Sequence, residues 1–163
     1  MRCAAVLTAA GSGTRLGHSL PKALVPLAGT PLLVHAARGL ATSGVVDAVV
    51  VTAPDGHLEE VASLFPGGRV PGSEVPVRVV AGGATRQASV AAGLTALDDV
   101  APACEAVLVH DAARCLASPE LVRRIVAALE AGHGAVVPGI PVTDTVKRVV
   151  DLPGGGARVV ETP

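Results

Sequence analysis

The sequence holds 163 residues with a formal net charge of −1, and half of its residues are hydrophobic. This length predicts one domain with a substantial core, which must be aliphatic because Phe65 is the one aromatic residue. The balanced charge and the lack of aromatic side chains exclude phosphate-tracking and base-stacking nucleic-acid binders, and no apolar run reaches the roughly 18 residues of a membrane span.

The first predicted element is a buried strand at 3–8, and a glycine-rich loop follows it directly. The loop reads Ala-Ala-Gly-Ser-Gly-Thr-Arg-Leu-Gly over residues 9–17, and Pro21-Lys22 comes shortly after it. Backbone N–H groups of such a loop can close on phosphate oxygens because glycine leaves the approach open. Lys22 is one of only two lysines among 13 basic residues, and with Arg15 it would supply positive charge to an anion site.

Two common phosphate-binding loops do not fit this stretch. The dinucleotide fingerprint G-x-G-x-x-G matches Gly11 and Gly13 but has Leu16 at its third glycine, and no glycine precedes a lysine as a P-loop requires. The alternative to an anion site is a plain tight turn in which Arg15 and Lys22 are exposed and bind no ligand. The pattern A-A-G-x-G-x-R-x-G followed by P-K resembles the signature loop of nucleotidyltransferases that join a nucleoside triphosphate to a sugar or polyol phosphate.

The elements after the loop alternate between helices and strands. First come a helix at 32–40 with Thr30 as N-cap and Pro31 in its first turn, a strand at 47–52, and a helix from the cap Asp55 to about Leu64. Then follow a strand at 77–81, a helix at 85–97, a buried strand at 106–110, a helix opened by Ser118 and closed by Gly132, and a strand at 134–138. This alternation predicts an α/β fold with a Rossmann-like, mostly parallel sheet flanked by helices.

Three predicted segments lie at the carboxyl ends of strands, where parallel sheets gather their ligands. They are the loop after the first strand, Gly82-Gly83 with the residues that follow, and residues 110–114, which read His-Asp-Ala-Ala-Arg. We expect these three segments to meet in one cleft, which makes them the candidate binding site.

The pattern changes after Pro138. Residues 141–148 alternate in polarity, residues 151–157 hold a glycine-rich turn, and residues 158–161 could return as a second strand. This predicts a β-hairpin that protrudes from the single domain of residues 1–163, with 141–163 as a dimerisation arm. A lone hairpin is marginal in water and would pack on a second subunit, although an edge hairpin on the same sheet fits the sequence equally well.

The cysteines point to a reducing compartment. Cys3, Cys104 and Cys115 are odd in number and lack C-x-x-C spacing, which indicates free thiols rather than a disulfide framework or a metal site. The histidines also lack metal-ligand spacing. Met1-Arg2 and the apolar run after it superficially match a signal peptide, but the run is short and leads into the glycine-rich loop, so we expect a cytoplasmic protein.

Four segments together resemble the 2-C-methyl-D-erythritol 4-phosphate cytidylyltransferases of the non-mevalonate isoprenoid pathway. They are residues 9–15 with Pro21-Lys22, residues 82–90, residues 110–114 and residues 144–148. The first segment alone also fits sugar-phosphate uridylyltransferases, whereas the second and third are more specific. Ala10 and Ala113 look less like the ribitol-phosphate cytidylyltransferases, the nearest relatives of this family. The resemblance implies transfer of CMP from CTP to 2-C-methyl-D-erythritol 4-phosphate with release of pyrophosphate.

The resemblance also implies roles for individual residues. Arg15 and Lys22 would be the catalytic pair that grips the triphosphate and stabilises charge at the α-phosphate. The implied nucleotide-binding set is Ala9, Ala10, Gly11, Gly13, Gly83, Ala84, Ser89 and Asp111. Asp111 and Arg114 would also lie near the polyol substrate, and Thr145 would reach its phosphate from the hairpin of a second subunit.

Several features depart from the family pattern. Ala23 stands where glutamine is common, Cys115 where proline is usual, and Ala84 where an acidic residue is common in the base-binding loop. Members of the family also continue past the position of Pro163 with further strands, a substrate arginine and a second lysine. The chain is therefore expected to be incomplete at its C-terminus.

The implied reaction needs no protein nucleophile, because a phosphate oxygen of the substrate attacks the α-phosphorus of CTP in line. Catalysis is then positioning and charge stabilisation by Arg15, Lys22 and Arg114. The expected cofactor is Mg²⁺ bound mainly through the CTP phosphates, with no metal site built from the protein alone. The alternatives are a ribitol 5-phosphate cytidylyltransferase, a sugar-phosphate uridylyltransferase, and a non-catalytic nucleotide-binding α/β module.

Overall fold

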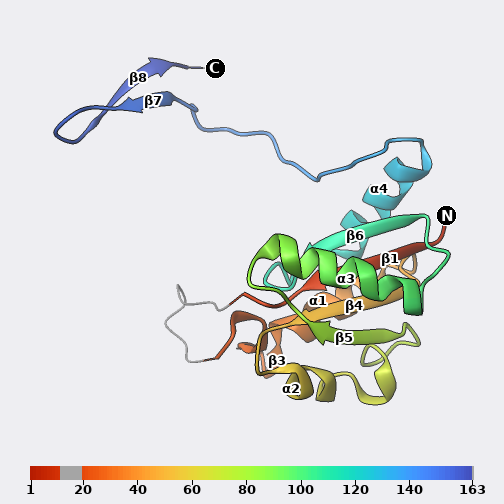
Figure 1. Cartoon of the computed structure of the whole chain (residues 1–163). Helices are drawn as coiled ribbons and strands as arrows, with labels where there is room; N and C mark the ends of the chain where they lie inside the picture. Colours follow the sequence, from red (N-terminus) through yellow and green to blue (C-terminus); the bar gives the residue numbers. More distant parts are fainter. Residues whose placement is uncertain (12–19, 163) are drawn as a thin grey trace.

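A four-stranded parallel sheet forms the centre of the computed structural model, which describes residues 1–11 and 20–162 (Figure 1). The strands are β1 (Cys3–Thr8), β4 (Ala48–Ala53), β5 (Val77–Ala81) and β6 (Ala106–Asp111), in the spatial order β5-β4-β1-β6. All three pairings within this sheet are parallel. The predicted α/β class with a mostly parallel sheet is therefore confirmed.

Helices cover both faces of the sheet. α3 (Arg86–Val100) lies on one face, and α1 (Leu32–Thr42), α2 (Leu58–Ser63) and α4 (Pro119–Glu130) belong to the opposite side (Figure 1). Alternate residues of β1 enter the two cores: Ala4 and Val6 face α3, and Ala5 and Leu7 face α1. Because both faces of β1 and β4 are buried, their sequences are mostly apolar runs rather than alternating ones.

Short elements complete the domain. A 3-10 turn, η2 (Lys22–Leu24), precedes the small hairpin of β2 (Pro26–Leu27) and β3 (Thr30–Pro31), and a second 3-10 turn, η3 (Pro66–Gly68), follows α2. Near the end of the chain, β7 (Arg148–Asp151) and β8 (Ala157–Glu161) pair in antiparallel fashion, which confirms the predicted hairpin. Its first strand begins only at Arg148, the last residue of the predicted first arm at 141–148, and residues 141–147 form no strand. Figure 1 shows this hairpin apart from the body of the domain, at the end of an extended segment.

The predicted strand at 134–138 is wrong. These residues form no strand, and the side chain of Val137 is 88% exposed. An apolar run becomes a strand only where a neighbour accepts its hydrogen bonds, and here the segment leads away from the sheet (Figure 1). Strand β6 is consequently an edge strand, and Val109 within it is 43% exposed rather than buried as expected.

Two predicted helix starts also differ from the structure. Thr30 and Pro31 form β3, so that Pro31 occupies the N-cap position of α1 and no side chain caps the helix. Helix α2 begins at Leu58, after His57, and not at a cap formed by Asp55. In both places the expected capping residue belongs to another element: Thr30 pairs within β3, and Asp55 lies in a turn. Ser118 opens α4 as predicted, and its side-chain oxygen accepts from Leu121 N. Thr85, predicted as the first residue of its helix, instead caps α3, and its side-chain oxygen accepts from Ala88 N.

Candidate active site

The three predicted segments meet at the carboxyl edge of the sheet. Thr8, at the end of β1, lies in register with Thr52 of β4 on one side and with Asp111 of β6 on the other. Beyond the strands, Ala9 N donates to Thr52 O at 3.0 Å and Ala112 N donates to Thr8 O at 3.0 Å. Gly82 N donates to the last carbonyl of β4 at 2.9 Å, which brings the third segment to the same edge.

The turn from β5 into α3 is packed too tightly for side chains. A Cβ added to Gly82 would lie 2.5 Å from Ala10 Cβ and 2.9 Å from Ala53 O. A Cβ added to Gly83 would lie 2.4 Å from Ala88 Cβ. Gly82 therefore allows the turn to lie directly against the loop after β1, and Gly83 allows it to lie against the first turn of α3, which leaves backbone groups at the surface of the site.

Ser89 fixes the shape of this turn from inside. It is 2% exposed, and its Oγ accepts from Gly83 N at 3.1 Å. The same hydroxyl lies 3.0 Å from Thr85 O and 3.2 Å from Gly83 O, the two carbonyls to which it can donate. Ser89 thus holds the turn in place, and the groups that the turn offers to a ligand are those of its backbone.

Asp111 forms the charged centre of the edge. Its Oδ1 accepts from Arg86 Nε at 3.1 Å, Arg86 Nη2 at 3.0 Å and Thr8 Oγ1 at 3.1 Å, and its Oδ2 accepts from Arg114 Nε at 3.2 Å. Burial raises the pKa of this carboxyl, but the hydrogen bonds from Arg86, Thr8 and Arg114 outweigh burial and bring the pKa below its ordinary value of 3.8. Asp111 is therefore ionised at neutral pH.

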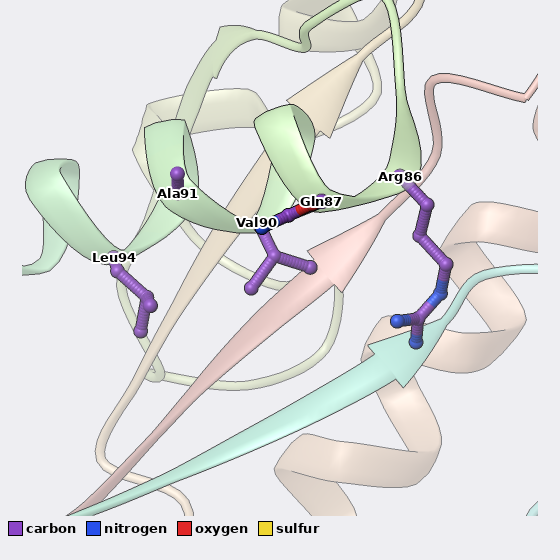
Figure 2. A pocket seen from close by; sticks show the side chains of 5 residues that line it. All are labelled: Arg86, Gln87, Val90, Ala91 and Leu94. Atoms are coloured by element: carbon purple, nitrogen blue, oxygen red, sulfur yellow. The ribbon is translucent and has the colours of Figure 1, made fainter.

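Arg86 is a residue that the motif analysis did not assign to the site. It is the first residue of α3, and Figure 2 shows its side chain reaching from the helix terminus towards the end of β6. One signal was available in the sequence: a cation in the first turn of a helix opposes the helix dipole and calls for a compensating anion. Arg86 also lines a hollow of about 500 Å³ along α3, with Gln87, Val90, Ala91 and Leu94.

His110 supports the turn after β6. Its Nε2 lies 3.2 Å from the carbonyl oxygen of Arg114, to which the neutral ring can donate. Burial lowers the pKa of His110 below its ordinary value of 6.5, although this hydrogen bond opposes the shift. A neutral His110 therefore ties together the two ends of the segment that carries Asp111 and Arg114.

Apart from Thr145, the other predicted site residues fall into three groups. Ala9 is buried, Ala10 is half-buried, Gly11 and Ala84 are exposed, and all four lie in the segments that meet at this edge. Lys22 is half-buried at the start of η2, beside the buried Ala23 and Leu24. Arg15 and Gly13 lie outside the described residues.

Thr145 does not join the other site residues within one chain. It is exposed and precedes β7, in the extended segment that leads away from the domain (Figure 1). Among the described residues, no group of three or more His, Cys, Asp or Glu side chains could hold a metal ion. Within the same residues, no helix is both long and apolar enough to cross a bilayer.

Comparison with known proteins decides the family. The profile of the family described as 2-C-methyl-D-erythritol 4-phosphate cytidylyltransferase matches residues 3–162. The chain belongs to this family. A 2-C-methyl-D-erythritol 4-phosphate cytidylyltransferase of Rhodococcus opacus is 50% identical over 98% of this chain, and one of Streptomyces avermitilis is 47% identical over 99% of it.

Solved structures agree with the sequence comparison. The 4-diphosphocytidyl-2C-methyl-D-erythritol synthase of Anaerococcus prevotii matches 99% of this chain with a TM-score of 0.78 and 28% identity. The chain spans about two thirds of the length of these relatives: 68% of the Rhodococcus opacus protein, 64% of the Streptomyces avermitilis protein and 64% of the Anaerococcus prevotii structure.

Proposed function

We propose that the protein transfers CMP from CTP to 2-C-methyl-D-erythritol 4-phosphate, giving 4-diphosphocytidyl-2-C-methyl-D-erythritol and pyrophosphate. The observation that carries the proposal is the meeting of the Gly82–Ser89 turn with the Asp111–Arg114 turn at the sheet edge, in a chain of this family. One turn offers backbone groups suited to a flat base, and the other offers the guanidinium group of Arg114, which is suited to phosphate.

The chemistry follows from the charges at this edge. An oxygen of the substrate phosphate attacks the α-phosphorus of CTP in line, and the bond to the pyrophosphate oxygen breaks. Lys22 and Arg15 would stabilise the charge that builds on the α-phosphate, and Arg114 would hold the attacking phosphate. No protein nucleophile is required, because the substrate supplies its own ionised oxygen.

The residues of the site fit a metal ion that arrives with the nucleotide. Both oxygens of Asp111 already accept hydrogen bonds from the protein, and no cage of protein ligands exists among the described residues. Mg²⁺ suits such a site because it binds through phosphate oxygens and keeps several waters. When bound, it would offset the repulsion between the two anionic reactants.

The same proposal assigns a partner to the hairpin. Residues 1–163 would form one nucleotidyltransferase domain with 141–163 as its arm, and five valines of the arm are 43–52% exposed, namely Val146, Val149, Val150, Val159 and Val160. A second copy of the chain would cover them and receive Thr145 at its substrate phosphate. Free Cys3, Cys104 and Cys115 support a cytoplasmic location for this homodimer.

Ligand-dependent thermal stability tests the nucleotide assignment. With Mg²⁺ present, CTP should raise the Tm more than UTP, GTP or NAD does, because binding to the folded state alone stabilises it. Equal shifts for CTP and UTP would favour a uridylyltransferase. A CTP shift without product from any polyol phosphate would favour a non-catalytic nucleotide-binding module, and product from ribitol 5-phosphate alone would reassign the substrate.

A further inference from the structure

The carboxylate of Asp111 is shared unequally between two arginines. Within the described residues, Oδ1 receives three hydrogen bonds, two from Arg86 at 3.0 and 3.1 Å and one from Thr8 at 3.1 Å. Oδ2 receives a single one, from Arg114 at 3.2 Å. Arg86 is thus the two-point partner of Asp111, and Arg114 is the one-point partner.

The two arginines also differ in how firmly they are anchored. Arg86 begins a helix of 15 residues that is capped by Thr85 and packed on the sheet. Arg114 lies in a turn after β6, closed by its own N–H to Asp111 O at 2.9 Å, and its side chain is 79% exposed against 63% for Arg86. Of the two contacts, the one made by Arg114 is therefore the easier to exchange for a ligand.

The position of Arg86 has no rationale within its own helix. The first turn of α3 holds no acidic residue, so the guanidinium faces the positive end of the helix dipole without a local counter-charge. Asp111, on a different element, is the anion that compensates it. The pair connects the turn proposed to hold the base with the turn proposed to hold the polyol phosphate.

We propose that Arg86 is a positioning residue: it holds Asp111 by Oδ1, so that Arg114 can leave Oδ2 and bind the phosphate group of the polyol substrate. This role rests on the proposed function, in which Arg114 contacts that substrate. When Arg114 moves away, Asp111 keeps Arg86 and Thr8 as partners and is not left as an unpaired charge. Without Arg86, Arg114 is the remaining cationic partner of Asp111 among the described residues, and its release becomes less favourable.

In NMR spectra of ¹⁵N-labelled protein, the Nε–H signals of Arg86 and Arg114 report on the two side chains. Each signal is assigned by its loss in Arg86→Lys or Arg114→Lys. On titration of the wild type with inorganic phosphate, the Arg114 signal should move while the Arg86 signal stays in place. In Arg86→Gln, half-saturation of the Arg114 signal should need about fivefold more phosphate, the upper range for an exposed ion pair. Arg86→Lys keeps the charge and should stay within about twofold of the wild type.

The matched control is Arg78→Gln. Arg78 is also exposed and paired with an aspartate, Asp99 at 2.9 Å, but it lies within β5 and outside the site. Its loss should leave the phosphate titration unchanged. An Arg114 signal that does not respond to phosphate, or an Arg86 signal that moves together with it, overturns the proposal even if Arg86→Gln fails to fold. An unchanged titration in folded Arg86→Gln overturns it as well.

The outcome stays separate from that of the proposed function. The same wild-type sample, supplied with CTP, Mg²⁺ and 2-C-methyl-D-erythritol 4-phosphate, is scored for product by ³¹P NMR. An Arg114 signal that responds to phosphate in the wild type and needs about fivefold more phosphate in Arg86→Gln, without product from the wild type, means that the proposed function fails while the role of Arg86 in phosphate binding stands. If the wild type forms product but Arg86→Gln leaves the phosphate titration unchanged, the proposed function stands and the role of Arg86 fails.

Discussion

The packing of α3 on the sheet depends on the absence of a side chain at Gly93. Gly93 is a buried helical residue above β1 and β4. A Cβ there would lie 2.4 Å from Val6 Cγ1 and 3.2 Å from Thr52 Cγ2, whereas ordinary contacts begin at 3.4 Å. The change Gly93→Ala therefore forces Val6 and the helix about 1 Å apart, at the element whose N-terminus carries Arg86 and Ser89.

Two effects of Gly93→Ala oppose each other. Alanine favours the helix over glycine by about 1 kcal/mol, whereas overpacking a core costs about 1–3 kcal/mol. Val6 is fully buried on a central strand and its branched side chain has few rotamers, so the cost falls near the upper limit. We expect a net loss of about 2 kcal/mol in the free energy of unfolding, measured by urea denaturation.

A double-mutant cycle checks this explanation. Val6→Ala removes the methyl groups that the new Cβ of Gly93→Ala would meet. The variant that carries both changes should therefore be less destabilised than the sum of the single variants, by about 1–2 kcal/mol. Thr95→Ala on the exposed face of α3 is the propensity control and should gain about 0.5 kcal/mol or less. A Gly93→Ala protein as stable as the wild type, or strictly additive variants, would refute the packing of α3 described above.

Three further predictions concern the site. Lys22→Ala should keep the fold and lower kcat about 100- to 1,000-fold, because this is the usual loss when a donor aimed at developing charge is removed. A loss in kcat below about threefold would exclude the catalytic role of Lys22. Gly82→Ala should weaken CTP binding about tenfold in calorimetry, because the new Cβ would push against Ala10 and Ala53. The control Gly134→Ala, whose new Cβ would meet no atom within 4 Å, should bind CTP as the wild type does. Because the pKa of His110 is lowered in the folded state, the unfolded state binds the proton of this ring at a higher pH than the folded state does. The free energy of unfolding should therefore decline as the pH falls from 6.5, and His110→Gln should flatten that decline. An unchanged slope in His110→Gln would exclude this origin.

Local patterns in the sequence predicted the centre of the fold well. β1, β4, β5 and β6, helix α3 and the start of α4 at Ser118 follow from apolar runs, a capping residue and turn glycines that act over a few neighbouring positions. The rule that ligands gather at strand ends also located the turns that hold Gly82 and Asp111. Both turns meet the loop after β1 in the structure.

What the sequence could not predict depends on partners distant along the chain. The apolar run at 134–138 looks like a strand, but a strand exists only where another one pairs with it. The pairing of Arg86 with Asp111 joins residues 25 positions apart: the position of Arg86 in the first turn of a helix calls for an anion, but no local pattern identifies Asp111 as that anion. The proposed place of Thr145 in the site of a second subunit stays a prediction.

The most direct test of the proposed function follows the phosphorus atoms of the reaction. The protein is incubated with CTP, Mg²⁺ and 2-C-methyl-D-erythritol 4-phosphate, and ³¹P NMR is recorded over time. The phosphomonoester signal of the substrate should be replaced by the paired signals of a new diphosphate ester, together with inorganic pyrophosphate. UTP in place of CTP should give far less product. A substrate phosphomonoester signal that persists while CTP is bound, or equal conversion with UTP, would contradict the assignment.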